Sequence, residues 1–163
     1  KKERIYLDEE ILLGMLVAFM GFLVFFIVVA IILYVLQAIG LFKIAKREGR
    51  SDIAWLAWIP IISQFLMTLL VEDDVHPNLR GKFTLLYGVA FVLSMILSSF
   101  VFFVTFIPAA MIFYAFYFIA KRYSPNAVLH LVISIITIGI SIPIQLFMFR
   151  NRDMIDNDSI ITE

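Results

Sequence analysis

Residues 11–39 read ILLGMLVAFMGFLVFFIVVAIILYVLQAI, a continuous apolar run without one acidic or basic side chain. A helix needs about 20 such residues to cross the hydrocarbon core of a bilayer, which is roughly 30 Å thick. The run is about twice as long as the apolar core of a signal peptide, and no small-x-small cleavage site follows it. We therefore expect residues 11–39 to form a retained membrane-spanning helix.

The composition of the whole chain agrees with lipid as its surroundings. Of the 163 residues, 63% are hydrophobic and 16% are charged, and the apolar residues form unbroken runs without the spacing of an amphipathic helix. The 13 basic and 13 acidic residues balance, so no basic field recruits nucleic acid. Cysteine is absent, which excludes disulfides and cysteine-based metal sites. We expect a multi-pass protein of the cell membrane with the lipid bilayer, and no nucleic acid, as its partner.

A second apolar tract covers residues 83–120. As one helix it would measure about 57 Å, nearly twice the thickness of the hydrocarbon core. We expect it to fold back as a hairpin with spans at 83–101 and 104–120. The bend is placed between Ser98 and Pro108, where serine, threonine and proline interrupt the tract.

The last apolar tract covers residues 127–149. Ser124 and Pro125 supply an N-cap and a first-turn proline before it, and we expect it to form the final span, interrupted by Gly139 and Pro143. We find no convincing internal repeat of the inverted-topology kind, and no appended linker or soluble domain. Residues 1–163 are therefore expected to form a single membrane domain.

Residues 53–71 are long enough to cross the membrane, but their sequence disfavours a plain span. Pro60 interrupts the middle of the segment, and polar residues follow it at once. Trp55 and Trp58 stand at its start, where indole rings prefer the headgroup layer. We expect a re-entrant or interfacial helix pair here, with a fifth span as the alternative.

The basic residues predict the orientation of the chain. Lys43, Lys46, Arg47 and Arg50 form the densest basic cluster and follow the first span directly, as cytoplasmic loops do. Lys121 and Arg122 are expected to anchor a later span at the membrane interface, as are the two tryptophans. The predicted fold class is thus an all-α, polytopic transmembrane bundle of four spans plus the helix pair, or five spans. The loops expected on the cytoplasmic side are 43–52, 72–82 and 121–126, with both termini outside.

The apolar tracts carry no ionisable group of the kind that marks ion paths or catalysis in membranes. No metalloprotease, phosphate-loop or nucleophile-elbow motif is present, so we expect no enzyme, no catalytic residue and no cofactor. His130 lies one turn into the last tract, where an imidazole reaches the interface. The other polar side chains are expected to bond across helices or to their own turn: Gln37, Gln64, Gln145, Ser94, Ser98, Ser99, Thr105, Ser134, Thr137 and Ser141.

Two small groups of residues are candidates for specific roles. Asp73, Asp74 and His76 lie close enough in sequence to hold a divalent cation at the membrane face, although a solvated loop that ends a helix explains them equally well. The stripe formed by Gly14, Ala18 and Gly21 on the first helix permits close helix packing, either within the chain or between two copies.

The stretch IAKREGRSDIAWLAWIPI, residues 44–61, joins a basic, glycine-containing loop to a tryptophan-bearing segment that ends in Ile-Pro. It resembles a segment of small, uncharacterised multi-spanning bacterial integral membrane proteins. In those proteins an asparagine and aromatic residues often follow the proline, whereas Ile-Ser-Gln-Phe follows here. The resemblance implies a location in the bacterial cytoplasmic membrane and brings no catalytic residue with it.

Three functions remain open on this sequence. The leading hypothesis is a non-enzymatic accessory or regulatory membrane subunit, which packs its helices against a larger membrane complex or against a second copy of itself. The second is a small oligomeric channel or transporter for a neutral or apolar solute, in which Pro60, Pro108 and Pro143 break helices. The third is a metal-dependent enzyme at the cytoplasmic face, built on the acidic loop described above.

Overall fold

The structure is a computed structural model that describes the backbone of residues 2–155 and the side chains of residues 10–155. Over this part of the chain every regular element is a helix. The chain divides into two compact units, Lys1–Tyr34 and Val35–Glu163.

The first helix, α1, covers Lys2–Arg47 and contributes to both units. It extends past the expected end at residue 39 because no proline or glycine turn interrupts it before Gly49, whose φ is +77°. Arg50 N–H donates to the Ala45 carbonyl at 2.9 Å, which completes a Schellman-type helix end. The basic residues Lys46 and Arg47 therefore lie in the last helical turn, where they interact favourably with the helix dipole.

Two helical segments are long and apolar enough to cross a membrane, Glu10–Arg47 and Phe102–Tyr123. The second consists of a 3-10 turn, η2 (Phe102–Thr105), followed by α4 (Phe106–Tyr123). Pro108 lies in the first turn of α4, where its missing amide hydrogen costs no helical hydrogen bond.

Residues 53–71 form two short helices, η1 (Ala54–Trp58) and α2 (Ile62–Leu70), which contact each other. The break lies at Pro60 and at Ile61, whose φ of 68° is in the left-handed region. At about 13.5 Å, α2 is less than half as long as the hydrocarbon core is thick. The segment is thus a pair of short helices, neither of which is long enough to cross the hydrocarbon core by itself.

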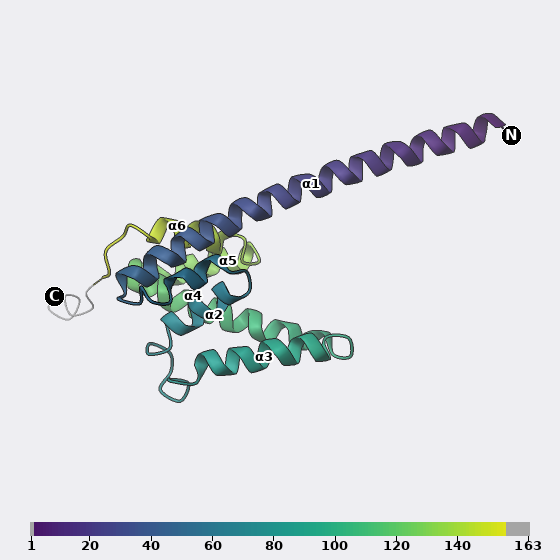
Figure 1. Ribbon diagram of the computed structural model, residues 1–163. Helices are drawn as coiled ribbons and strands as arrows, with labels where there is room; N and C mark the ends of the chain where they lie inside the picture. Colours follow the sequence, from purple (N-terminus) through teal and green to yellow (C-terminus); the bar gives the residue numbers. More distant parts are fainter. Residues whose placement is uncertain (1, 156–163) are drawn as a thin grey trace. The chain divides into compact units, whose positions relative to one another are not determined.

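Helix α3 (Phe83–Leu97) and α4 run side by side, as Figure 1 shows in teal and green. The chain turns between them at residues 98–101, where the Val101 amide donates to the Leu97 carbonyl at 2.8 Å. This turn lies inside the interval in which the sequence placed the bend. The helices themselves are Phe83–Leu97 and Phe106–Tyr123, in place of 83–101 and 104–120.

Residues 127–149, the tract expected to form the final span, form two helices, α5 (Ala127–Ile136) and α6 (Ser141–Phe149), with the break at the expected interruption near Gly139 and Pro143. Gly139 N–H donates to the Ser134 carbonyl and Ile138 N–H to the Ile135 carbonyl, the two bonds of a Schellman motif that ends α5. Pro143 cannot donate to the carbonyl four residues before it, which prevents a continuous helix. The segment folds back on itself, and α5 and α6 pack together.

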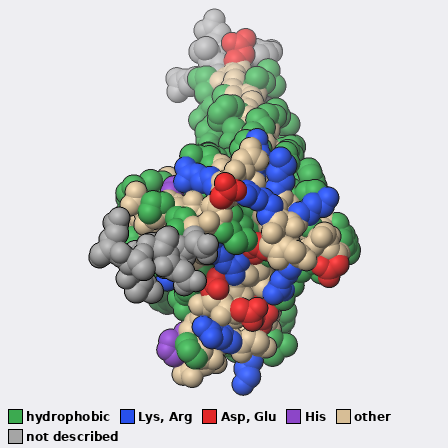
Figure 2. Space-filling model, turned by 90° about the vertical axis from the view of Figure 1, so that its left-hand side faces the viewer, with side chains coloured by type: hydrophobic (Ala, Val, Ile, Leu, Met, Phe, Trp, Pro, Cys, Tyr) green, Lys and Arg blue, Asp and Glu red, His purple; other side chains and the backbone are tan. Residues whose placement is uncertain are grey.

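Up to residue 155, where the description of the structure ends, the acidic residues, lysines and arginines of the second compact unit gather in four segments that we call the charged cap: 43–52, 72–82, 121–122 and 150–153. Figure 2 shows blue and red side chains spread over this face. Four ion pairs join the segments: Arg47–Asp153 (2.6 Å), Arg50–Asp73 (3.6 Å), Arg122–Glu48 (2.6 Å) and Arg122–Asp74 (2.6 Å). Each of the three apolar segments η1–α2, α3–α4 and α5–α6 therefore begins and ends at the cap. Residues 150–153, expected outside, lie beside residues 43–52, which are expected inside.

The core of this unit lies under the cap. Its fully buried side chains come from the end of α1, from α2, from α4 and from α6, among them Leu41, Ile44, Leu66, Met67, Phe116, Ile119, Leu146 and Phe149. The rings of Phe116 and Phe149 stack with centroids 6.3 Å apart. The close packing of short helices on the ends of α1 and α4 positions the two polar sites described next.

Candidate functional site

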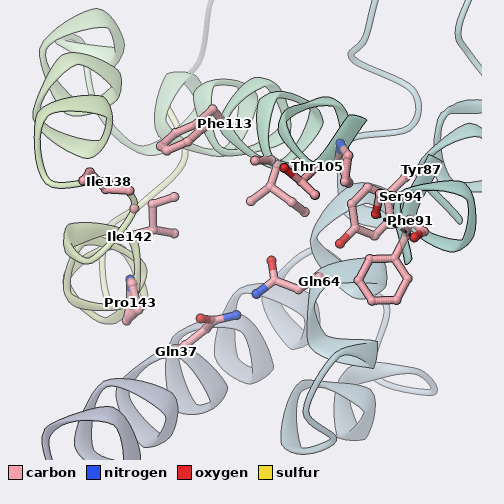
Figure 3. A pocket seen from close by; sticks show the side chains of 14 residues that line it. Gln37, Gln64, Tyr87, Phe91, Ser94, Thr105, Phe113, Ile138, Ile142 and Pro143 are labelled. Atoms are coloured by element: carbon pink, nitrogen blue, oxygen red, sulfur yellow. Dashed lines mark hydrogen bonds between the residues drawn. The ribbon is translucent and has the colours of Figure 1, made fainter. Parts of the chain in front are cut away.

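A cavity of about 430 Å³ lies in the second compact unit. Its walls come from α1, α2, α3, η2 and α4, from the turn between α5 and α6, and from the first turn of α6. Figure 3 shows Gln64 near the middle of the cavity wall, with Ile142 and Pro143 on one side and Tyr87 and Phe91 on the other. The volume falls within the range of small-molecule sites.

The polar groups of the cavity are all uncharged. The Ser94 hydroxyl donates to the Phe91 carbonyl at 2.8 Å, and the Thr105 hydroxyl donates to the Phe102 carbonyl at 2.7 Å. Gln37 Nε2 donates to Ser63 Oγ at 3.4 Å. The Gln64 side chain makes no hydrogen bond to another described residue. The cavity thus combines an apolar lining with a few polar groups, one of which is available to a ligand.

A second polar group holds α5 and α6 together. Gln145, which is 6% exposed, donates through Nε2 to Ser134 Oγ at 2.9 Å and to Ser141 Oγ at 2.8 Å. Its Oε1 lies 2.6 Å from His130 Nδ1. In one continuous helix His130 and Gln145 would be about 22 Å apart, so these bonds depend on the reversal of the chain.

The same bonds assign the proton on His130. Because the Gln145 amide group donates to two serines, its carbonyl oxygen is the acceptor, and His130 Nδ1 carries the hydrogen. His130 Nε2 then accepts from Ser124 Oγ at 3.1 Å. Both ring nitrogens are occupied within the chain, so His130 serves as a structural link between α5, α6 and the start of this segment.

Arg122 is the centre of the charged cap. It pairs with Glu48, whose side chain is 7% exposed, and with Asp74, and it donates through Nη2 to the Leu70 carbonyl at 2.9 Å. The Tyr123 hydroxyl donates to Glu48 Oε1 at 3.0 Å. The buried Glu48 carboxylate is thereby satisfied by two neighbouring residues at the end of α4.

The residues considered for a metal site have other partners. Asp73 pairs with Arg50 and Asp74 with Arg122, while His76 Nδ1 accepts from the Asn78 amide at 3.4 Å. Among the described residues, no group of three or more histidine, aspartate or glutamate side chains is arranged to hold a metal ion.

The remaining predicted residues lie on exposed surfaces. Trp55 and Trp58 are 56% and 47% exposed on η1, and Lys121 is exposed beside Arg122. Gly14, Ala18 and Gly21 are exposed on α1, and no neighbouring atom lies within 4 Å of a Cβ added at either glycine.

No family model, no curated protein and no solved structure matches this chain.

The structure reveals a repeated arrangement that the sequence analysis missed. The tetrapeptide Ile-Ala-Lys-Arg occurs at residues 44–47 and 119–122, at the ends of α1 and α4. Its isoleucine and alanine are fully buried in both copies. The visible signal was this exact tetrapeptide, followed in each case by an Ile-Pro-Ile sequence, at 59–61 and 142–144.

The two arginines of the repeat make matching contacts. Arg122 pairs with Asp74 and donates to the carbonyl of Leu70, the last residue of α2. Arg47 pairs with Asp153 and donates to the Arg150 carbonyl just after α6, at 3.3 Å. Asp74 and Asp153 follow the last residues of α2 and α6 at the same spacing. The arginine at the end of α4 thus binds the end of α2, and the arginine at the end of α1 binds the end of α6.

Proposed function

We propose that this chain is a multi-pass membrane protein that binds a neutral, partly polar small molecule in the cavity beside Gln64 and moves it across the bilayer. In this topology α1, α3 and α4 span the membrane, and η1–α2 and α5–α6 are re-entrant hairpins. The single observation that carries the proposal is a cavity lined by uncharged polar groups and by the turn residues Ile138 and Gly139 of the second helix break.

The charged cap supports the topology. Residues 53–71, 83–120 and 123–149 contain no lysine, arginine, aspartate or glutamate, and each of these segments returns to the cap. Charges at one end and none elsewhere are the distribution expected when the cap faces water and the rest faces hydrocarbon. The excess of lysine and arginine in the expected cytoplasmic loops favours the inner side for the cap.

The two breaks support a transport function. Re-entrant, irregular backbone at membrane depth is found where protein covers it or where it lines a cavity, and broken helices commonly form the binding sites of transporters. Here the turn residues Ile138 and Gly139 line the same cavity as Gln64, which follows the break at Ile61. Because no lysine, arginine, histidine or acidic residue lines the cavity, the solute class is neutral.

The test uses the full chain in proteoliposomes and measures the entry of glycerol, urea and sorbitol by stopped-flow light scattering. Gln64→Phe should fill the cavity and abolish any protein-dependent entry, whereas Met148→Phe, at a 50% exposed position, should leave it unchanged. Equal rates for the wild type and Gln64→Phe with all three solutes would contradict the proposal.

The exposed apolar helix favours a second function, that of an accessory subunit for a larger membrane complex or a homo-oligomer. From Ile11 to Val28 the described side chains of α1 are exposed, and the Gly14–Ala18–Gly21 stripe offers a place for close approach of another helix. Gly14→Leu with Gly21→Leu should then weaken co-purification of the partner from mild detergent. Recovery of a strictly monomeric chain at native expression levels would count against this function. The resemblance of residues 44–61 favours the bacterial cytoplasmic membrane for either function.

A further inference from the structure

A pocket lined by cations opens where α1 ends beside the end of α6. It has a volume of about 410 Å³ and is lined by Lys43, Lys46, Arg47, Arg150 and Asn151. No carboxylate is among these lining residues of the described chain. The pocket thus brings together two segments that are far apart in sequence and presents four cationic groups to one space.

Three of the four cationic side chains in this pocket have no acidic partner among the described residues. Only Arg47 has an acidic partner there, the exposed Asp153. Within the described chain, neither lysine has an ion pair, and Lys46 lies over the Phe42 ring at 4.5 Å. Arg150 stacks on the Phe147 ring at 3.3 Å, and its Nε is buried without a hydrogen-bond partner among the described residues.

The second copy of the Ile-Ala-Lys-Arg repeat provides a comparison within the same molecule. The pocket beside it is lined by Lys121 and Arg122 together with Asp74 and Arg80. The Asp74 carboxylate forms an ion pair with the Arg122 guanidinium at 2.6 Å. One turn before Lys121 the second copy has Phe118, whereas the first copy has Lys43 at the equivalent position. The second pocket therefore has one lysine fewer and a carboxylate of its own.

We propose that the pocket formed by Lys43, Lys46, Arg47 and Arg150 binds a phosphate group. Phosphate oxygens accept charge-assisted hydrogen bonds from lysine and arginine side chains. The pocket lies at the point where the apolar surface of α1 gives way to charge, which is the level of lipid headgroups if the apolar segments lie in a bilayer. An anionic phospholipid and free phosphate share this chemistry, and the experiment separates them.

The experiment uses the full chain in a neutral detergent and follows thermal unfolding during titration with short-chain phosphatidylglycerol. A second arm uses inorganic phosphate against chloride at equal ionic strength. Stabilisation by phosphatidylglycerol alone identifies the lipid as the source of the phosphate, and stabilisation by inorganic phosphate identifies the free ion. Absence of stabilisation in both arms overturns the proposal.

Two variants distinguish this pocket from the general charge of the cap. Lys43→Ala with Lys46→Ala should weaken binding about thirtyfold, the factor expected for two lysine contacts to an anionic lipid surface. Both lysines are exposed and have no ion pair in the described chain, so the variant should fold. The matched control Lys121→Ala removes the lysine of the second copy and should leave binding unchanged. Equal weakening by the control and by the double variant would overturn a specific site.

Discussion

Gly40 of α1 lies directly against the backbone of Leu146 in α6. A Cβ added to Gly40 would lie 2.7 Å from the Leu146 carbonyl carbon and 2.8 Å from its oxygen. The two helix backbones thus approach closely, at a glycine that lies 19 residues after Gly21 and outside the stripe that the sequence indicated. It joins the end of α1 to the α5–α6 segment, next to the cation-lined pocket.

Gly40→Ala should destabilise the protein by about 1–3 kcal/mol, because the neighbouring backbone must move to accept the methyl group. Circular dichroism during thermal unfolding in detergent measures the change. Gly14→Ala and Gly21→Ala are matched controls, since their added methyl groups meet no atom within 4 Å. The controls should be neutral or slightly stabilising, because alanine favours a helix over glycine. A loss in Gly40→Ala no larger than in the controls would show that α1 and α6 are not in contact.

Arg122→Met should destabilise the protein by about 3–5 kcal/mol, because it leaves the Glu48 carboxylate buried without its cation. The same unfolding measurement applies. Asp73→Asn breaks an exposed pair with Arg50 and should cost at most about 1 kcal/mol. Adding Glu48→Gln to Arg122→Met should recover part of the loss, since it removes the unpaired charge. Equal effects of Arg122→Met and Asp73→Asn would mean that Glu48 is hydrated.

Substitutions at the two neighbouring turn residues Ile138 and Gly139, between α5 and α6, should change the stability of the protein in opposite directions. Ile138 has a φ of 53°, a conformation costly for a β-branched residue, so Ile138→Gly should stabilise the protein by about 0.5–1 kcal/mol. Gly139 has a φ of 82°, so Gly139→Ala should lower the free energy of unfolding by about 1–2 kcal/mol. Ile136→Gly, at the end of α5, serves as a control and should lower the free energy of unfolding by about 1 kcal/mol. Destabilisation by Ile138→Gly of the same size as in the control would indicate a continuous helix here.

Cysteine labelling tests the return of α5–α6 to the cap. The chain has no cysteine of its own, so single-cysteine variants give no background. In oriented vesicles, Arg152→Cys and Asp52→Cys should react with an impermeant maleimide from the same side. Phe100→Cys, in the turn between α3 and α4, should react from the opposite side. Labelling of Arg152→Cys together with Phe100→Cys would restore the single span over residues 127–149.

Local sequence was sufficient for the helical content and for several boundaries. Pro60 and its polar neighbours predicted the break in residues 53–71, and the length of the 83–120 tract predicted that it must turn, which it does at residues 98–101. These features depend on the length of an apolar run or on a residue that cannot donate a backbone hydrogen bond.

The sites were less accessible to sequence reasoning. Gln64 and Gln145 were both noted as polar residues within apolar tracts, but one lines a cavity and the other joins two helices. Arg122 was expected as an interface anchor, and its pairing with Glu48 links the end of α4 to the turn that follows α1. No spacing along one helix indicates such partners.

The sequence by itself determined that the chain is helical and where long apolar runs begin and end, because hydrophobic length and proline chemistry act locally. Only the tertiary structure decided that residues 127–149 fold back. It also decided that the first Ile-Ala-Lys-Arg copy contacts the end of α6 and the second contacts the end of α2. Those outcomes depend on contacts such as Gly40 against Leu146 and Arg47 with Asp153. The partners in these contacts are brought together by packing between helices, which the order of residues along the chain does not specify.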